Sequence, residues 1–274
     1  MLGYIPSPAH GNVSIGPLEL HAYGLMLAIG VLVAAKIADV RWRRAGHDPK
    51  VITEIAVPVV IGGVIGARVY HLFTGYKWSE GGITGAFEIW KGGLSIWGAV
   101  AGGLIAVLII SRRRKLDTFA LLDAIAPGVV VAQAIGRWGN YFNQELFGRP
   151  SKLPWALRID IAHRPLAYVR YATFEPTFLY ESLWCLVVFF TIVGLERTRG
   201  LRKGQAFFLY VAMYTFGRIF FEWMRVDPAS RIFGVRFNLL LSAALCIVGI
   251  VGFVRMGRRT STDAAPTEVQ GLSG

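Results

Sequence analysis

GRWGNYFNQELFG, residues 136–148, follows an apolar run at Phe119–Ile135 that predicts a membrane span. The stretch holds one arginine, two asparagines and one glutamate among glycines and aromatic residues. A guanidinium suits phosphate oxygens, an amide both donates and accepts, and glycine lets the backbone approach a ligand. Because polar groups at a membrane interface are unfavourable unless they are used, the stretch predicts a functional site. The alternative is a tight loop that caps a helix and satisfies its own polar groups.

The composition indicates a helical membrane protein. Of 274 residues, 54% are hydrophobic and 17% are charged, which leaves too few charges to cover a water-soluble surface of this size. The formal net charge of +12 falls in short clusters between apolar runs, so it indicates membrane topology and anionic lipid rather than nucleic acid. Cys185 and Cys246 lie in apolar runs and predict neither a disulfide framework nor a metal site.

Seven apolar runs predict seven transmembrane helices, since about 20 mostly apolar residues cross a bilayer. The runs are Leu20–Val40, Val51–Phe73, Leu94–Ser111, Phe119–Ile135, Phe178–Leu195, Gln205–Trp223 and Phe237–Val254. The segment Met1–Pro17 holds no Lys or Arg, so we expect the first run to be retained rather than cleaved as a signal peptide.

Basic clusters follow every second predicted span. They are Arg41, Arg43 and Arg44; Arg112–Lys115; Arg197, Arg199, Arg202 and Lys203; and Arg255, Arg258 and Arg259. Because cytoplasmic loops carry the excess of Lys and Arg, all four clusters predict an outer N-terminus and a cytoplasmic C-terminus.

One membrane domain is expected over residues 1–259, with a disordered cytoplasmic tail at residues 260–274. In the outer segment Arg137–Thr177, apolar residues alternate from Trp155 to Ile161 and again over residues 169–173. This period predicts a small β-hairpin head at about residues 145–175. The expected fold class is therefore an all-α polytopic membrane protein with seven transmembrane helices and a small β-containing extracytoplasmic head.

Ionisable residues gather near the outer ends of the predicted spans. Arg218, Glu222 and Arg225 share one helical face because they are spaced i, i+4, i+7. The others at this depth are His21, Tyr23, Arg68, His71 and Glu181. Intramembrane charges normally face the bundle interior and mark a substrate path, so all of them would converge on residues 136–148.

Some of these residues also have simpler interpretations. Arg218 and Glu222 would form a structural ion pair. Arg225 would anchor its helix at the membrane interface, and His71 would be a hydrogen-bonded packing histidine.

The sequence contains no Ser-His-Asp order and no HExxH, CxxC or Walker pattern. The protein is therefore expected to lack a nucleophile of its own, a metal and a cofactor. Arginines, carboxylates and amides at lipid depth suit binding of a phospholipid headgroup, and they suit stabilisation of a phosphate that gains charge as it leaves.

Residues 136–148 also resemble the signature of the bacterial prolipoprotein diacylglyceryl transferases, Gly-Arg-x-Gly-Asn-aromatic-apolar-Asn-x-Glu-x-x-Gly, and fill every fixed position. The resemblance covers about Pro17–Arg236. It includes His21–Met26, Gly62–Arg68, Trp90–Ser95, Pro176–Glu181, and Gly217-Arg218 through Glu222 to Arg225.

The resemblance implies a seven-span enzyme of the bacterial inner membrane with its active site toward the outside. Such enzymes transfer sn-1,2-diacylglyceryl from phosphatidylglycerol to the lipobox cysteine of a prolipoprotein signal peptide. A thioether forms and glycerol phosphate leaves, in the first step of lipoprotein maturation. The nucleophile belongs to the substrate, which accounts for its absence here.

The resemblance also implies the site residues. Arg137 and Arg218 would grip the phosphate and stabilise its growing charge, and Tyr23 would line the site near the reacting carbon. Asn140, Asn143 and Glu145 would shape the headgroup pocket beside Gly139. Further candidates for binding phosphatidylglycerol are Arg68, Glu222 and His21.

Two departures from the family pattern concern the general base. Trp97 stands where well-known members carry a histidine that has been proposed to activate the cysteine, and Glu175 stands where others often have histidine. An indole has no basic nitrogen. The base is then either Glu145 or no protein group at all. In the second case the thiol, whose pKa is about 8.5, loses its proton to water.

Two other classes of function fit parts of the pattern. A transporter or channel would need a polar path to the cytoplasmic side, where only Lys36 and Asp123 are candidates. A lipid-binding structural or assembly protein would keep the arginines without turnover.

Overall fold

A computed structural model describes residues 3–8, 11–15, 18–74, 76, 82, 84–88, 93, 95–227, 231–232 and 234–258. Its long helices are α1 (Ala22–Arg44), α2 (Lys50–Thr74), α4 (Ile96–Arg113), α5 (Thr118–Phe142), α6 (Thr177–Arg199), α7 (Gln205–Met224) and α8 (Phe237–Arg258). Three antiparallel strand pairs join β1 (Asn12–Ile15) to β2 (Leu18–His21), β3 (Leu157–Arg158) to β4 (Thr173–Phe174), and β5 (Arg231–Ile232) to β6 (Val235–Arg236). The predicted tail at 260–274 lies outside the described residues.

Within the described residues, the seven long helices correspond one to one with the seven predicted runs. Six of them are long and apolar enough to cross a membrane; α7, which carries Arg218 and Glu222, is not among the six. Large apolar side chains such as Leu32, Phe190 and Ile247 are exposed along the helices, as a lipid-facing surface requires. The chain is therefore a mostly helical, multi-pass membrane protein.

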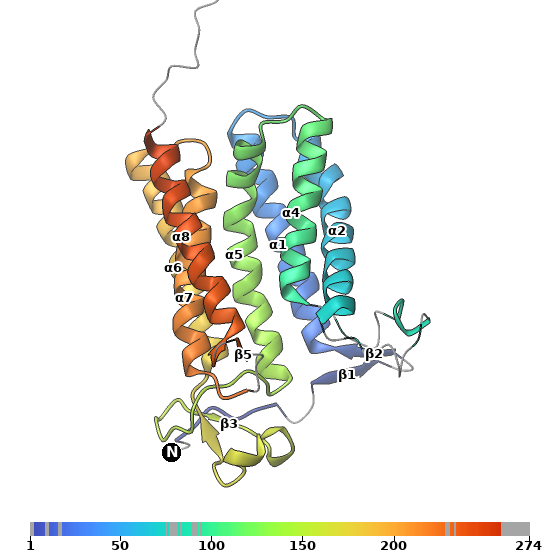
Figure 1. Cartoon of the computed structure of the whole chain (residues 1–274), viewed down its shortest axis with the longest axis vertical. Coiled ribbons are helices and arrows are strands. Elements are labelled where there is room, and N and C mark those ends of the chain that lie inside the picture. The colour runs from blue at the N-terminus through green and yellow to red at the C-terminus, as the bar shows by residue number, and fades with distance from the viewer. Residues whose placement is uncertain are drawn as a thin grey trace, which may run out of the picture.

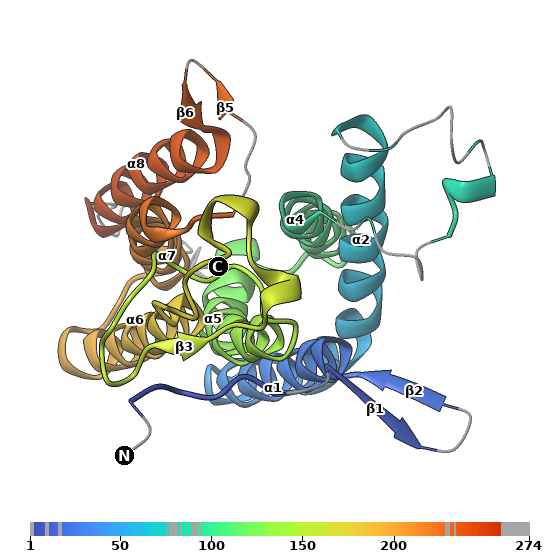
Figure 2. The same ribbon diagram turned by 90° about the horizontal axis from the view of Figure 1, so that it is seen from below.

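Helix α5 lies at the centre of the bundle. It packs against α1, α4, α6 and α7, which surround it in Figure 2. Beyond this inner group, α2 packs on α4 and α8 packs on α7. Buried apolar residues of α5 join its neighbours in two clusters: Leu121 packs with Trp42 of α1 and Ile55 of α2, whereas Val130 packs with Val188 of α6.

Glycines bring α2 and α4 into close contact. A Cβ atom added at Gly66 would lie 2.3 Å from the carbonyl oxygen of Gly98, and one added at Gly102 would lie 2.2 Å from that of Gly62. No other residue fits at these distances. Glycines at a helix interface let the two backbones approach closely, and here the contact lies within one chain.

Helix α5 is longer at its C-terminal end than the apolar run predicts. The run ends at Ile135, but the helix continues to Phe142 and so includes half of the 136–148 stretch. Gly139 does not end the helix because the ring of Tyr23 packs against it, where a Cβ would lie 2.5 Å from Cδ2 of that ring. Arg137 and Asn140 therefore project from a rigid helical turn rather than from a loop.

Residues 143–176, which we call the head, connect α5 to α6. They contain the β3–β4 pair and two 3₁₀ turns, Ile161–His163 and Leu166–Tyr168. The hairpin predicted over residues 155–173 is therefore reduced to two residue pairs. Leu157 and Ile159 are buried, but Ile161 is exposed, so the predicted alternation ends early.

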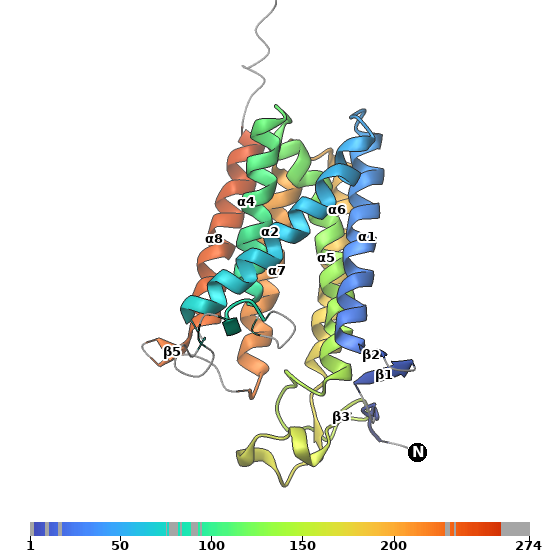
Figure 3. The same ribbon diagram turned by 90° about the vertical axis from the view of Figure 1, so that its right-hand side faces the viewer.

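The N-terminal segment occupies the other edge of β3. The amide of Ile5 donates to the carbonyl of Ala156 at 2.7 Å, and the amide of Arg158 donates to the carbonyl of Ile5 at 2.9 Å. Figure 3 shows this segment beside the head at one end of the bundle. The N-terminal segment therefore satisfies backbone groups on the edge of β3 that does not face β4.

The basic clusters lie together at the end opposite the head. Helices reverse direction at each connection, so α1, α4, α6 and α8 all end there (Figure 1). Basic residues occupy the last turn of each of the four. At the same end, Asp123 accepts from the backbone amides of Gly204 at 2.5 Å and Phe207 at 2.8 Å, and so caps α7.

We expect Gly66→Ala to destabilise the protein by about 1–3 kcal/mol, because its new methyl group would overlap the backbone of α4. Thermal unfolding in detergent measures this loss. The matched control is Gly63→Ala on the same helix, whose Cβ would make an ordinary contact at 3.4 Å with the carbonyl oxygen of Ala99. Equal melting temperatures for the two variants would contradict the close α2–α4 contact.

Candidate active site

The end of α5 and the loop after it form the first part of the site. Nδ2 of Asn140 donates to Oε1 of Glu145 at 2.8 Å, while Oδ1 of Asn140 accepts from Nη1 of Arg137 at 3.4 Å. Nδ2 of Asn143 lies 3.4 Å from the same glutamate oxygen. A carboxylate only accepts and a guanidinium only donates, so this set fixes the orientation of the Asn140 amide. The structure thus brings together four of the predicted residues.

The loop after α5 is held to the head in a constrained conformation. Gln144 and Leu146 have φ angles of +50° and +58°, which non-glycine residues rarely adopt. Nε2 of Gln144 donates to Oδ2 of Asp160 at 2.7 Å, and the Asp160 amide donates back to Oε1 of Gln144 at 2.8 Å. The hydroxyl of Thr177 donates to the carbonyl of Leu146. Head and α6 together therefore hold Glu145 in place.

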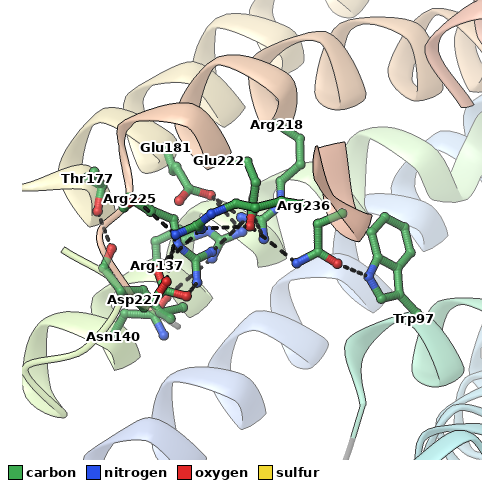
Figure 4. A network of polar contacts seen from close by, with 12 residues as sticks. Trp97, Arg137, Asn140, Thr177, Glu181, Arg218, Glu222, Arg225, Asp227 and Arg236 are labelled. Carbon is green, nitrogen blue, oxygen red and sulfur yellow. Dashed lines mark hydrogen bonds and ion pairs between the residues drawn. The ribbon is translucent and has the colours of Figure 1, made fainter. Parts of the chain in front are cut away.

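Two arginines from different helices share one carboxylate oxygen (Figure 4). Oε2 of Glu181, on α6, lies 2.8 Å from Nη2 of Arg137 and 3.1 Å from Nη1 of Arg218. Arg137 comes from α5 and Arg218 from α7, and Nη2 of Arg137 also donates to the hydroxyl of Tyr214 at 3.4 Å. All three charged side chains are largely buried. Glu181 therefore joins α5, α6 and α7 and sets the spacing of the two guanidinium groups.

Glu222 extends the network from Arg218 toward α8. Its side chain is fully buried, and its Oε2 lies 3.0 Å from Nη2 of Arg218 and 3.6 Å from Nη1 of Arg225. Its Oε1 accepts from Nη1 of Arg236 at 3.0 Å and from Nδ2 of Asn238 at 3.4 Å. The predicted ion pair of Arg218 with Glu222 is thus present, as one contact of a larger network.

Asp227 completes the network, and it binds Arg225. Nε and Nη2 of Arg225 donate to the two oxygens of Asp227 at 2.7 and 3.0 Å. Arg225 is 8% exposed, so its interpretation as an interface anchor is wrong. Two of its neighbours are carboxylates, which explains how this charge is buried.

The network concentrates positive charge at the head end of the bundle. Four arginines meet three carboxylates directly, and the fourth carboxylate, Glu145, reaches them only through the amide of Asn140. Arg137 and Arg218 converge on one oxygen, so their like charges lie close together in a largely buried place. An anionic phosphate oxygen between them would lower this repulsion and would match the planar guanidinium forks.

The other residues predicted to bind substrate lie on or before α1 and on α2. Tyr23, in the first turn of α1, packs its ring on Gly139 beside the network. His21 precedes α1 and is exposed. Arg68 lies on α2, and its guanidinium donates to the carbonyls of Gly85, Ala86 and Gly93. These contacts hold the connection between α2 and α4.

His71 lies one turn beyond Arg68 on the same helix. Its ring packs edge-on against Tyr76, with centroids 6.3 Å apart, and a Cβ at Gly93 would lie 2.5 Å from its Nε2 atom. These contacts agree with the interpretation of His71 as a packing residue.

Trp97, which lies where a histidine base would be expected, has a polar contact of its own. Its Nε1 donates to Oδ1 of Asn238 at 2.9 Å, and so links α4 to α8. Asp227, Arg236 and Asn238 are the members of the network that sequence reasoning missed. Arg236 marks only the end of the part of the chain that resembles the family. Nothing in the local pattern indicates that Asn238 faces Glu222.

Glu145 lines a pocket of about 310 Å³, which is bounded by the 142–145 loop together with Pro8, Gly11 and His163. A second pocket, of about 330 Å³, lies among α6, α7 and α8 and has an apolar surface that includes Trp184 and Phe216. Its lining extends to Phe253, near the end of α8 opposite the head. The first pocket therefore adjoins the candidate site, at Glu145. Among the described residues, no group of three His, Cys, Asp or Glu side chains is placed to bind a metal ion.

Comparisons with known proteins all indicate one family. A family model described as prolipoprotein diacylglyceryl transferase matches residues 11–255. A phosphatidylglycerol–prolipoprotein diacylglyceryl transferase of Frankia alni is 45% identical over 271 residues, which are 98% of this chain and 71% of the relative.

Further relatives carry the same name. The Streptomyces griseus protein is 43% identical over 282 residues, covering 98% of this chain and 86% of its own length. The Corynebacterium diphtheriae protein is 40% identical over 274 residues, covering 94% of this chain and 97% of its own length.

We expect Glu181→Gln to destabilise the protein by about 3 kcal/mol or more, because it leaves two buried arginines without their shared counter-charge. The control is Glu54→Gln, which breaks a half-exposed ion pair with Arg114 and should change stability by about 1 kcal/mol or less. Chemical or thermal unfolding in detergent compares them. A Glu181→Gln protein as stable as Glu54→Gln would refute the joining role of Glu181.

Proposed function

The chain belongs to the prolipoprotein diacylglyceryl transferase family, and we propose that it transfers diacylglyceryl from phosphatidylglycerol to the lipobox cysteine of a prolipoprotein. The cysteine sulfur attacks the diacylglyceryl carbon that bears the phosphate. A carbon–sulfur bond forms, the carbon–oxygen bond to phosphate breaks, and glycerol phosphate leaves with the bonding electrons. The observation that carries the proposal is the pair of largely buried arginines, Arg137 and Arg218, that converge on one oxygen of Glu181.

The arginine pair suits the charge that develops in this reaction. A phosphodiester carries one negative charge, and the departing monoester gains a second as the carbon–oxygen bond breaks. Guanidinium groups already held in place stabilise that charge without reorganising, which is the largest single contribution in many enzymes. Glu181 keeps Arg137 and Arg218 at a fixed spacing, and Glu222 holds Arg218 from its other side.

The polar residues at the end of α5 and in the loop after it are suited to the glycerol headgroup. In our proposal Asn140, Asn143 and Glu145 form hydrogen bonds with its hydroxyl groups, since amides donate and a carboxylate accepts. Gly139 brings the end of α5 against Tyr23, whose ring lines the site near the reacting carbon. Arg68 and His21 contribute at the rim of the headgroup site.

Glu145 is our candidate for the base that takes the thiol proton. It lines the 310 Å³ pocket together with Pro8, Gly11 and His163, and the peptide segment that carries the cysteine would bind there. The amides of Asn140 and Asn143 donate to Oε1 of Glu145 and so hold its carboxylate in place.

We also propose that all seven helices of one catalytic domain, residues 1–259, cross the bacterial inner membrane, with the head outside and the C-terminus cytoplasmic. The basic clusters at the end opposite the head support this orientation. Helix α7 can cross because Arg218 and Glu222 are paired.

A transporter is the less favoured alternative. Asp123, one of its two inner candidates, is engaged in capping α7. Nearby, Nη1 of Arg41 donates to Glu196 at 2.8 Å. These contacts hold the end opposite the head together and argue against a polar path.

The test is mass spectrometry of a synthetic lipobox peptide incubated with purified protein and phosphatidylglycerol. We expect a diacylglyceryl adduct on the cysteine, its loss with Arg137→Ala, and a fall of about 100-fold or more with Arg137→Lys, since lysine cannot contact phosphate with a planar fork. Arg41→Lys, which alters an arginine–glutamate pair at the opposite end, should retain activity. Tight lipid binding without any adduct would instead identify a lipid-binding protein.

The base is tested by the pH dependence of Glu145→Gln. We expect turnover to fall by about 100-fold or more at every pH, because the amide cannot accept the proton. If the thiol instead loses its proton to water, turnover of the wild type and of the variant would be equal and would rise together, about tenfold per pH unit up to the thiol pKa of about 8.5. Glu145 would then not be the base.

A further inference from the structure

Trp97 is connected to the arginine network through a single amide. Trp97 lies in the first turn of α4, and its Nε1 donates to Oδ1 of Asn238 at 2.9 Å. Asn238 lies in the first turn of α8, and its Nδ2 donates to Oε1 of Glu222 on α7 at 3.4 Å. The two contacts join α4 to α8 and, through Glu222, to α7, the helix that carries Arg218 (Figure 4).

The partners of Asn238 determine which way its amide faces. An indole N–H only donates, and a carboxylate only accepts, so Oδ1 must face Trp97 and Nδ2 must face Glu222. With a partner that could also accept, the amide could turn over and present its oxygen to the carboxylate. Trp97 therefore holds the donor side of Asn238 toward Glu222.

Glu222 depends on this donor side for its orientation. Its Oε2 is fully buried and, within the described residues, makes ion pairs but no well-aligned hydrogen bond. Only its Oε1 accepts such bonds, from Arg236 and Asn238. The position of Oε2, 3.0 Å from Nη2 of Arg218, is thus set from the Oε1 side.

We propose that Trp97 is a positioning residue, which orients Asn238, through it Glu222, and through Glu222 the phosphate-binding Arg218. This inference rests on the proposed transferase function. It assigns the indole a role that requires no basic nitrogen: the N–H fixes an amide, and the amide fixes a buried carboxylate. Arg218 then meets the phosphate in the geometry shared with Arg137.

The experiment measures kcat and KM for phosphatidylglycerol with the purified full chain and a lipobox peptide, per folded molecule. Trp97→Phe keeps an aromatic ring but loses the N–H, and we expect kcat to fall about tenfold with KM within about twofold, since one hydrogen bond to a charged network is lost.

The matched control is Trp155→Phe. Trp155 also donates from Nε1 to an oxygen at 2.9 Å, the hydroxyl of Tyr180, but it lies in the head outside the arginine network. Its replacement should leave kcat unchanged. A purely structural role for Trp97 would lower thermal stability or yield and leave kcat per folded molecule at the wild-type value, which would overturn the proposal.

A double-mutant cycle with Asn238→Ala gives the decisive comparison. If Trp97 acts through Asn238, Trp97→Phe should cause no further fall in kcat once Asn238 is alanine. Independent, multiplying effects would overturn the proposal, as would wild-type kcat for Trp97→Phe. These failures leave wild-type transfer intact, whereas absence of transfer by the wild-type protein would overturn the proposed function together with this inference.

Discussion

A buried glutamate that forms ion pairs with two arginines at once is the interaction on which this structure depends. Glu181 gathers α5, α6 and α7 at one depth, because Arg137 and Arg218 must both reach it. Guanidinium groups are tolerated inside a membrane-spanning bundle only when paired, so the helices that carry them cannot separate at this level. In the proposed reaction the same pairing would hold both guanidinium groups in place before the phosphate binds.

The surroundings of Glu181 show how a rigid scaffold carries a reactive loop. Arg137 and Asn140 stand on the last turn of α5, where the ring of Tyr23 on Gly139 keeps α1 in close contact. The loop beyond adopts two rare backbone conformations, and Gln144 ties it to Asp160 in the head. This arrangement gives the head a structural purpose: it holds the loop that presents Glu145.

Much of this could be predicted from the sequence because the signals are local. Apolar runs give the helices, basic clusters give a common end, and the spacing of Arg218 and Glu222 places them on one face. The end of α5 was placed too early because a glycine-rich stretch reads as a loop, whereas packing against Tyr23 keeps it helical. The β-hairpin is shorter than its alternating pattern predicts because the chain leaves strand conformation in the two 3₁₀ turns at Ile161–His163 and Leu166–Tyr168.

The site residues that the sequence does not predict were missed for a different reason. Arg236 and Asn238 lie across a connection from α7, and they meet Glu222 only because α8 folds back along that helix. Arg225 reads as an interface anchor until Asp227 is seen to bind it. Sequence chemistry alone shows that Trp97 lacks a base, and only its distance to Asn238 reveals a donor.

The central claim is that Arg137 and Arg218 together receive the lipid phosphate. The most direct measurement is an experimental structure of the protein with phosphatidylglycerol bound, from which the distances between phosphate oxygens and both guanidinium groups are read. The account predicts phosphate oxygens at about 2.7–2.9 Å from nitrogens of Arg137 and of Arg218. A phosphate bound elsewhere, with both arginines still turned only to Glu181, would contradict it.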